Sequence, residues 1–281
     1  MDVFDLPVVR QLIERALAED VGDGDITTRL TVPAQRRARA EIAAKQRAIV
    51  AGLPLVSRVC AAVGGDITVV THVTDGTPVT PGAVLATVSG PAASLLVAER
   101  LSLNFLQHLS GIATLTAQFV AAVHGHRCRI VDTRKTTPGL RVLEKYAVRV
   151  GGGYNHRTRL DDGILIKDNH ITAAGGVRAA VAAARAGAPH GLRVEVECAT
   201  LADVDEALAG GADAVLLDNM TVDAIAEAVR RIGGRAVVEV SGGVNLDTVG
   251  AIAATGVDII SVGALTHSAP AVDIHMTLFL D

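Results

Sequence analysis

Several residue types are scarce in this chain of 281 residues, and each scarcity excludes a class of protein. Aromatic residues make up 2% of the sequence, tryptophan is absent, and the net charge is −4. Because a nucleic-acid surface is typically basic and carries aromatic side chains on which bases stack, no nucleic-acid partner is expected. The cysteines, Cys60, Cys128 and Cys198, are scattered without a CxxC pair, which argues against a disulfide framework and a zinc site.

Long hydrophobic runs and an N-terminal leader pattern are also missing. Apolar residues make up 49% of the chain, yet no uncharged stretch reaches the ~18 residues that a membrane span needs. The first residues, MDVFDLPVVR, lack a basic head and an apolar core, so no signal peptide is expected. The composition therefore predicts a cytoplasmic enzyme without a membrane partner, long enough for one barrel and a smaller domain.

From Arg129 onward the sequence repeats one unit, a short β-rich run with a charged or glycine-containing end, followed by an alanine-rich helical stretch. After Lys167, the markers at the run ends follow at intervals of 30, 21, 23 and 22 residues: Glu197, Asp218, Ser241 and Gly263. Each interval has the length of one strand and one helix, which indicates parallel strands with helical crossovers. The carboxyl ends of such strands meet on one face of a barrel, where barrel enzymes keep their chemistry.

The first part of the chain follows different patterns. Asp5 and Pro7 are typical of a helix start, with Asp5 as the N-cap, and the helix is expected to end at a polar turn over residues 19–28. Residues 38–90 predict short strands and turns in a compact β-rich region. Residues 94–122 have helical spacing, with Gly111 interpreted as a break between two helices, and the boundary with the barrel is expected here.

The middle of the sequence collects cationic side chains at predicted strand ends and loops: Arg134, Lys135, His156, Arg157 and Lys167. Three glycines precede His156 and allow the backbone to turn tightly or to approach a ligand. Arginine suits planar carboxylates, whereas lysine is a compact charge for phosphates. Any one of these side chains alone would more often form a surface salt bridge, but together they favour a binding site for a polyanion.

Acidic and glycine-rich strand ends complete the predicted face. Glu195 and Glu197 alternate on one strand and face the same side, with Glu197 nearer the carboxyl end, and Asp218 holds the same place on the next strand. Such carboxylates bind Mg²⁺ or sugar hydroxyls, or else pair with the cations. Backbone N–H groups in the turns Ser241-Gly242-Gly243 and Gly263-Ala264 are candidates for binding phosphate.

Eight segments carry a resemblance to a known family: EDVGDGDITT, AERLSLNFLQHLSGIAT, DTRKTTPGLRVLEKYAVRVGGGYNHR, ILIKDNH, VEVE, LLDNM, VSGGV and SVGALTHS. With these motifs the chain resembles the quinolinate phosphoribosyltransferases of NAD biosynthesis nearly end to end. The resemblance implies an α/β fold in which an N-terminal α/β sandwich, residues 1–110 joined by the tail 268–281, precedes an incomplete, open α/β barrel, residues 111–267, with the active site. It also implies a homodimer with shared active sites, or a higher oligomer.

The resemblance further implies a role for each candidate residue. Quinolinate would be bound by Arg134, His156, Arg157, Lys167 and, from the partner chain, Arg100. The helical pattern around Arg100 by itself favours a packed stem with a solvated head. Lys135 would contact quinolinate or the pyrophosphate of phosphoribosyl pyrophosphate, and Glu197 and Asp218 would hold the ribose hydroxyls and Mg²⁺. The 5′-phosphate would be cradled by Ser241, Gly242, Gly243, Gly263 and Ala264.

The implied activity is transfer of the phosphoribosyl group to quinolinate with loss of CO₂, and two alternatives stay open. A relative of the phosphoribosyltransferase-like proteins encoded with molybdate transporters would use another acceptor, but the pairing of GGGYNHR with KDNH favours quinolinate. A non-catalytic phosphometabolite-binding protein is disfavoured by the intact Glu197 and Asp218. A preference for nicotinate over the diacid would instead indicate the related salvage enzymes.

Overall fold

The computed structural model describes residues 2–280, and its internal contacts divide the chain into two compact units. The first unit comprises the chain up to Ala117, Thr137–Gly152 and the chain from Ala269; the second comprises Gln118–Thr136 and Gly153–Ser268. The sequence-based division differs by one residue at the tail and in two longer segments, because it leaves residues 111–117 and 137–152 in the barrel. The second of these segments holds α5 (Arg141–Val150), whose Tyr146 packs edge-on against Phe4 with ring centroids 4.8 Å apart.

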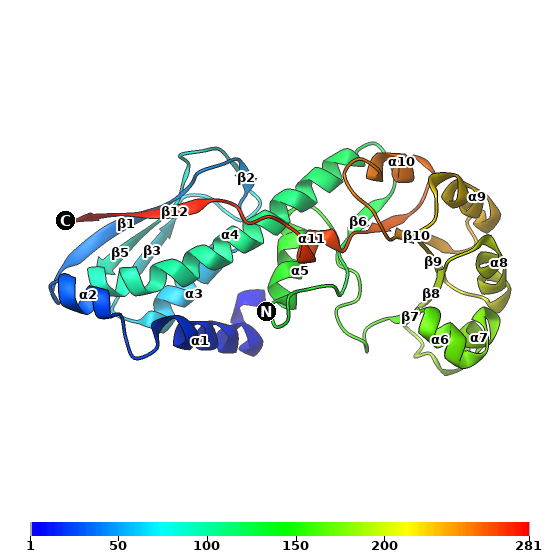
Figure 1. The fold of residues 1–281 in the computed structure, drawn as a ribbon, viewed down its shortest axis with the longest axis horizontal. Coiled ribbons are helices and arrows are strands. Elements are labelled where there is room, and N and C mark those ends of the chain that lie inside the picture. Colours follow the sequence, from blue (N-terminus) through cyan, green and yellow to red (C-terminus); the bar gives the residue numbers. More distant parts are fainter. Residues whose placement is uncertain (1, 281) are drawn as a thin grey trace. The chain divides into compact units, whose positions relative to one another are not determined.

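An antiparallel sheet of four strands, in the order β12-β1-β5-β3, forms the centre of the first unit (Figure 1). Its strands are β1 (Arg37–Ala44), β3 (Thr68–Thr71), β5 (Val84–Pro91) and β12 (Ile274–Leu280), and a separate short pair joins β2 (Ala48–Ile49) to β4 (Pro78–Val79). In β1, Ala38, Ala40 and Ile42 are buried while Arg39 and Glu41 face the other side, which is the alternation of a half-buried strand. Because β12 pairs with β1, the end of the chain returns to the first unit.

The helices of this region are η1 (Val3–Asp5), α1 (Pro7–Val21), α2 (Ile26–Thr31), α3 (Leu53–Val63) and α4 (Ala92–Ala122). Pro7 occupies the first turn of α1 as predicted, but the predicted N-cap is wrong: Leu6 caps the helix, and the Asp5 carboxylate pairs with Arg58. The predicted polar turn also contains the start of α2, because Asp25 accepts the N–H of Thr28 at 2.9 Å and so caps a new helix.

The prediction missed α3, which lies within the stretch interpreted as strands. Its apolar residues have helical spacing and are buried: Leu53, Leu55, Val56, Val59 and Cys60. A proline lies in the first turn of α3, where its missing N–H costs no helical hydrogen bond, and Gly52 precedes it with φ of +97°. Because glycine and proline are typical of turns, the sequence pattern indicated a turn where a helix begins.

The prediction of a helix break at Gly111 is wrong, because α4 is one continuous helix of 31 residues. Glycine is needed there for packing rather than for bending. A Cβ at position 111 would overlap the carbonyl oxygen of Pro270 and lie 3.3 Å from the Cα of Ala271. The segment that leads into β12 thus runs directly against the helix surface, and the amide of Val272 donates to the carbonyl of Gln107 at 3.0 Å.

Six parallel strands form the second unit, in the order β6-β11-β10-β9-β8-β7. They are β6 (Arg129–Val131), β7 (Ile164–Ile166), β8 (Val194–Cys198), β9 (Ala214–Asp218), β10 (Val237–Ser241) and β11 (Ile259–Ser261). Each predicted strand is present, and β6 and β7 lie at the two edges, with no ladder joining them among the described residues. The sheet is therefore an open α/β barrel, as expected.

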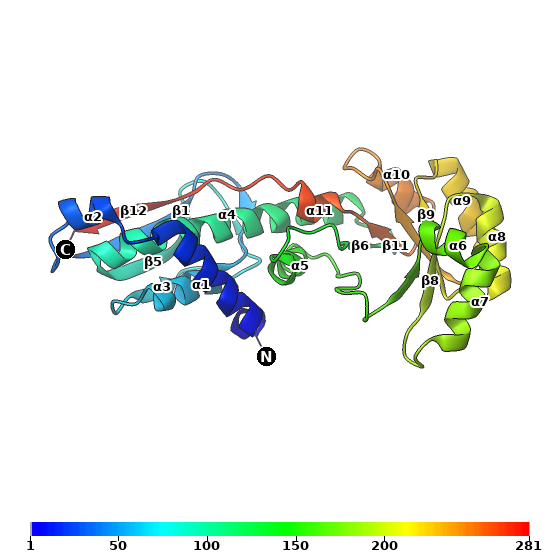
Figure 2. The same ribbon diagram turned by 60° about the horizontal axis from the view of Figure 1, so that its bottom comes forward.

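Helices between the strands cover the outside of this sheet: α6 (Asp168–Ala174), α7 (Val177–Gly187), α8 (Leu201–Gly210), α9 (Val222–Ile232) and α10 (Val249–Ala254). A short helix, α11 (Ala264–His267), follows β11. Figure 2 shows α7, α8 and α9 side by side along one face of the strands. All strands run the same way, so the residues that follow them meet at one edge. In the part of the chain that the structure describes, no helix is long and apolar enough to cross a membrane.

Candidate active site

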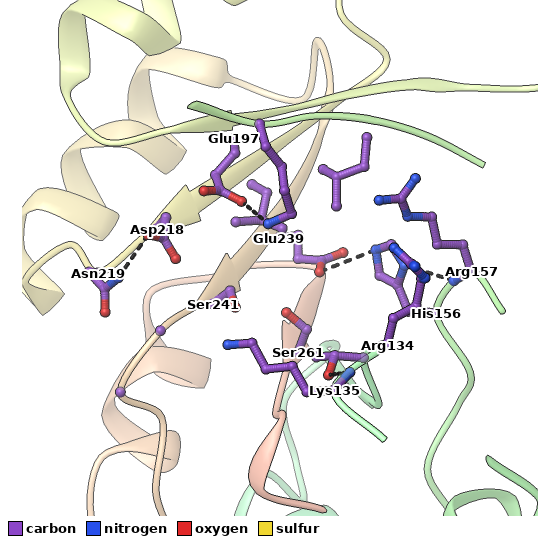
Figure 3. Close-up of a pocket in the computed structure, with 16 residues that line it drawn as sticks. Arg134, Lys135, His156, Arg157, Glu197, Asp218, Asn219, Glu239, Ser241 and Ser261 are labelled. Carbon is purple, nitrogen blue, oxygen red and sulfur yellow. Dashed lines mark hydrogen bonds and ion pairs between the residues drawn. The ribbon is translucent and has the colours of Figure 1, made fainter. Parts of the chain in front are cut away.

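A cavity of about 550 Å³ opens at the carboxyl edge of the six-stranded sheet (Figure 3). Its lining includes ten of the predicted site residues: Arg134, Lys135, His156, Arg157, Lys167, Glu197, Asp218, Ser241, Gly242 and Gly243. Prediction did not include the others: Thr133, Leu165, Leu216, Asn219, Glu239 and Ser261. The polar side chains come from several strand ends, which only the parallel topology brings together.

Three predicted residues do not line this cavity. Arg100 lies on α4 in the first unit with its side chain 57% exposed. Gly263 and Ala264 follow β11, and Gly263 lies directly under a lining residue, because a Cβ there would be 3.0 Å from Cδ of Lys135. The absence of a side chain at Gly263 therefore leaves room for the lysine.

The loop after β6 is fixed by hydrogen bonds between its backbone and two threonine hydroxyls. The N–H of Lys135 donates to Oγ1 of Thr133 at 3.0 Å, and Oγ1 of Thr266 donates to the carbonyl of Lys135 at 2.7 Å. These bonds hold the chain while leaving the lysine side chain to point into the cavity. Beside it, Nε of Arg134 is buried and has no hydrogen-bond partner among the described residues. An unpartnered guanidinium nitrogen at a cavity wall is available to an anion.

The glycines before His156 serve the packing of the chain more than a ligand. A Cβ at Gly151 would collide with the carbonyl oxygen of Ala113 and with Thr116, and Gly152 has φ of +87°. The turn that they allow leads to His156 and Arg157. Nη1 of Arg157 donates to the carbonyl of Gly163 at 3.1 Å.

Arg134 and Arg157 lie close enough to repel each other. Burial lowers the pKa of Arg157, and the charge of Arg134 lowers it further. An arginine stays charged even so, because its ordinary pKa lies far above neutrality. The wall between β6 and β7 therefore holds two like charges that a dianion would relieve.

Lys167 and Glu197 form an ion pair at the ends of the adjacent strands β7 and β8. Next along the sheet, Oδ2 of Asp218 accepts from Nδ2 of Asn219 at 2.7 Å. The backbone N–H of Asn219 donates to the backbone carbonyl of Ser241 at 3.0 Å. A Cβ at Gly242 would collide with the side chain of Asn219, so glycine allows the loops after β9 and β10 to approach. Carboxylate oxygens on neighbouring strands are a donor set that suits Mg²⁺.

His156 lies at the cavity floor between two glutamates that come from different strands. Nε2 is 3.2 Å from Oε2 of Glu195 and 3.5 Å from Oε1 of Glu239. Prediction had placed Glu195 on the same side as Glu197 without a role and had missed Glu239. The signal for Glu239 was present, since a charged residue interrupts the apolar strand two positions before Ser241 and must share its face.

The three groups share their protons. Burial by itself would lower the pKa of His156, but the nearby carboxylates of Glu195 and Glu239 raise it to about 10. Burial also raises the pKa of Glu195. The amide of Arg157 donates to Nδ1 at 2.7 Å, and because an amide keeps its proton, Nδ1 must be the acceptor. The proton that would make His156 an imidazolium is therefore held by one of the two glutamates. The total charge of the three groups is the same as with a charged imidazole and two carboxylates.

Family models match almost the whole chain. The model described as quinolinate phosphoribosyl transferase, N-terminal domain, matches residues 25–110, and the model of the C-terminal domain matches residues 112–277. The chain belongs to the quinolinate phosphoribosyl transferase family. The two matches meet at residue 111, within α4, and the second contains every residue that lines the cavity.

Individual members of the family are similar to this chain over nearly its full length. A nicotinate-nucleotide pyrophosphorylase [carboxylating] of Mycobacterium leprae is 46% identical over 96% of this chain and 96% of its own length. A quinolinate phosphoribosyltransferase [decarboxylating] 1b of Nicotiana tabacum is 42% identical over 96% of this chain and 82% of its own. The crystal structure of NadC from Streptococcus pyogenes is 43% identical with a TM-score of 0.93, covering 97% of both chains.

Proposed function

We propose that this protein converts quinolinate and phosphoribosyl pyrophosphate into nicotinate mononucleotide, CO₂ and pyrophosphate in NAD biosynthesis. The observation that carries the proposal is the gathering of cationic residues and two carboxylates around one cavity: Arg134, Lys135, Arg157, Lys167, Glu197 and Asp218. Two polyanionic substrates must be brought together, and a cation-rich cavity offsets their repulsion. Membership of the family and the names of its members support the same activity.

Quinolinate is expected at the wall formed by the arginines. Arg134 and Arg157 are the natural partners of its two carboxylates, because a guanidinium binds a carboxylate through paired hydrogen bonds. Lys167 adds a third charge once it leaves Glu197, and His156 adjoins the same wall. The unpartnered Nε of Arg134 supports this position for the diacid.

Phosphoribosyl pyrophosphate is expected at the strand ends from β8 to β11. Glu197 and Asp218 would accept the ribose hydroxyls, and Lys135 would contact the pyrophosphate. The turns at 241–243 and 263–264 would bind the 5′-phosphate through backbone N–H groups. The glycines of the first turn support this role, since Gly242 and Gly243 have φ of +89° and +61° and leave the backbone open to a ligand.

The chemistry then follows from position and charge. The pyridine nitrogen attacks C1′ as the bond from C1′ to pyrophosphate breaks, and the ribosyl group gains positive charge. Glu197 and Asp218 would stabilise that charge, and Lys135 the leaving pyrophosphate. Ribosylation makes the ring a pyridinium, whose positive nitrogen stabilises the electron pair left on C2 when the bond from C2 to its carboxylate breaks. CO₂ leaves, and a proton adds to C2.

Mg²⁺ is proposed as the cofactor, held by Glu197 and Asp218 together with substrate oxygens. The fit lies in the donor set, because Mg²⁺ is commonly bound by one or two carboxylates plus phosphates and keeps several waters. When bound, the ion would neutralise charge on the pyrophosphate. The His156–Glu195–Glu239 group could also bring three ligand atoms together. It suits a cation less well, since Nε2 of His156 is committed to the carboxylates and Nδ1 to a backbone amide.

The proposal also covers the oligomeric state of the protein and its cellular compartment. We expect a cytoplasmic homodimer in which Arg100 of one chain completes the site of the other. Its support is that Arg100 is exposed on α4 and that, among residues 2–280, its ionic partner is the neighbouring Glu99 at 3.9 Å. A higher oligomer built from such dimers would keep the same site.

The test is to incubate the protein with quinolinate, phosphoribosyl pyrophosphate and Mg²⁺ and to follow nicotinate mononucleotide and CO₂ together. Equal amounts of both, with no product when nicotinate replaces quinolinate, are expected. Pyrophosphate release without CO₂ would indicate a different acceptor. No pyrophosphate release by folded protein with any acceptor would contradict a transferase.

A further inference from the structure

Two glutamates that face His156 have no part in the reaction just described. Glu195 and Glu239 lie inside β8 and β10, and their side chains are 12% and 2% exposed. Oε1 of Glu239 is buried and makes no hydrogen bond within the described residues, with Nε2 of His156 at 3.5 Å as its ionic partner. Buried negative charge beside a site for a dianion weakens binding unless it serves another purpose.

The purpose is suggested by how His156 is held. Its backbone N–H donates to Oδ1 of Asp132 at 2.9 Å, which fixes the main chain. Its Nε2 faces the carboxylates of Glu195 and Glu239, which fixes one edge of the ring. Its Nδ1 accepts the N–H of Arg157 at 2.7 Å, which fixes the other edge. Rotation of the ring would break contacts on both edges at once.

The consequence reaches Arg157, a proposed carboxylate ligand. Its amide is tied to the imidazole, and its guanidinium is tied by Nη1 to the carbonyl of Gly163. The plane of the peptide between His156 and Arg157 therefore follows the orientation of the ring, and that plane sets where the arginine side chain begins. Repulsion by Arg134 would otherwise push the guanidinium away from the wall.

We propose that Glu195 and Glu239 are positioning residues, which hold the imidazole of His156 through Nε2 so that its Nδ1 orients Arg157 toward the pyridine dicarboxylate. This inference rests on the proposed function and refines it. Both ring nitrogens of His156 are engaged within the protein, so His156 acts through Arg157 instead of binding the diacid itself. The carboxylates of the diacid are then left to Arg134, Arg157 and Lys167.

Strand geometry explains why two glutamates are needed. In the sheet register, Glu239 is level with Leu216 and Glu197, whereas Glu195 lies two residues lower on its strand. The two carboxylates thus approach Nε2 from different levels and from strands separated by β9. Together they restrict the ring in two directions, which one acceptor could not do.

Kinetics of matched variants test the proposal. We expect Glu239→Ala to raise the KM for quinolinate about tenfold or more, the scale of losing one contact of a charged group, and to leave the KM for phosphoribosyl pyrophosphate within about twofold. Glu239→Gln, which keeps an oxygen acceptor, should have a smaller effect in the same direction. Glu227→Gln on the surface of α9 is the matched control. An equal change in both KM values, or in neither, would overturn the proposal.

Two further measurements separate positioning from folding and from the reaction itself. Calorimetric binding of quinolinate alone should weaken in Glu195→Gln and Glu239→Gln while thermal unfolding stays cooperative. ¹⁵N spectra, with His156→Asn to identify the signals, should show His156 protonated at Nε2 and bare at Nδ1 in the wild-type protein. A proton on Nδ1 would overturn the arrangement. If wild-type protein did not use quinolinate, the proposed function would fail, and these spectra alone would decide how His156 is held.

Discussion

Lys167 at the end of β7 and Glu197 on β8 form an ion pair inside the cavity. In the proposed reaction both residues have other partners, the lysine a substrate carboxylate and the glutamate the ribose. The pair is therefore a resting arrangement that the two substrates exchange for contacts of their own. It keeps both charges compensated until the substrates bind.

Removal of either cavity lysine should reduce catalysis strongly. We expect Lys167→Ala and Lys135→Ala each to lower turnover by a factor on the order of 10²–10³, the range for one electrostatic group in a preorganised site. Steady-state kinetics with both substrates measure the effect. Lys45→Ala, at an exposed position of the first unit, is the control. Near-normal rates in both cavity variants would contradict the assignment of this site.

Gly263 should limit the position of Lys135. An alanine Cβ there would lie 3.0 Å from Cδ of Lys135 and 3.2 Å from Nε2 of His267, while φ of −64° suits any residue. We expect Gly263→Ala to fold normally and to lower kcat/KM about tenfold, because the lysine must move from its place. Gly250→Ala, whose Cβ has its nearest neighbour at 3.7 Å, should keep wild-type kinetics. Unchanged kinetics in both would show that Lys135 has room to adapt.

Gly111 should matter for stability and not for chemistry. A side chain there would drive α4 away from Pro270, and overpacking of this kind costs about 1–3 kcal/mol of unfolding free energy. Urea unfolding of Gly111→Ala measures the loss. Gly187→Ala, at a helical position with open space, should be neutral or slightly stabilising. Equal stability of the two variants would contradict the close approach of the chain at Gly111.

The proton held by His156, Glu195 and Glu239 should make stability depend on pH. Between the ordinary pKa of a histidine, 6.5, and the raised pKa of about 10, the three groups together keep one more proton in the folded protein than in the unfolded chain. The stabilisation is complete below pH 6.5 and is lost as pH rises through 10. The difference in unfolding free energy between wild type and His156→Asn should therefore shrink from pH 6 to pH 10. Exposed His126→Asn is the control, and a constant difference for His156→Asn would contradict the prediction.

Much of the second unit could be predicted from local pattern. Each strand ends in a polar or glycine-containing turn at regular spacing, so the sequence alone places Lys167, Glu197, Asp218 and Ser241 at one edge. The reason is physical: when parallel strands are joined by helical crossovers, all their carboxyl ends lie at the same edge of the sheet. Residues that carry chemistry at such ends can be found by counting along the chain.

Other features depended on contacts between distant segments. The pattern around Gly111 was the same whether the glycine bends a helix or admits Pro270, and only the packed chain distinguishes them. Tyr146 and its helix α5 follow the first barrel strand in sequence, yet their packing partners include Phe4 at the start of the chain.

The sequence by itself determined the repeat of strand and helix, the open barrel and most of the cavity wall, because these follow from periodicity and from residue types at strand ends. Only the tertiary structure decided that Glu239 from β10 reaches His156 beside Glu195 from β8. Periodicity tells which face of a strand a side chain occupies, but the level at which side chains of different strands meet depends on register. Register is set by the packing of the whole sheet, so it cannot be predicted from the residue pattern of one strand.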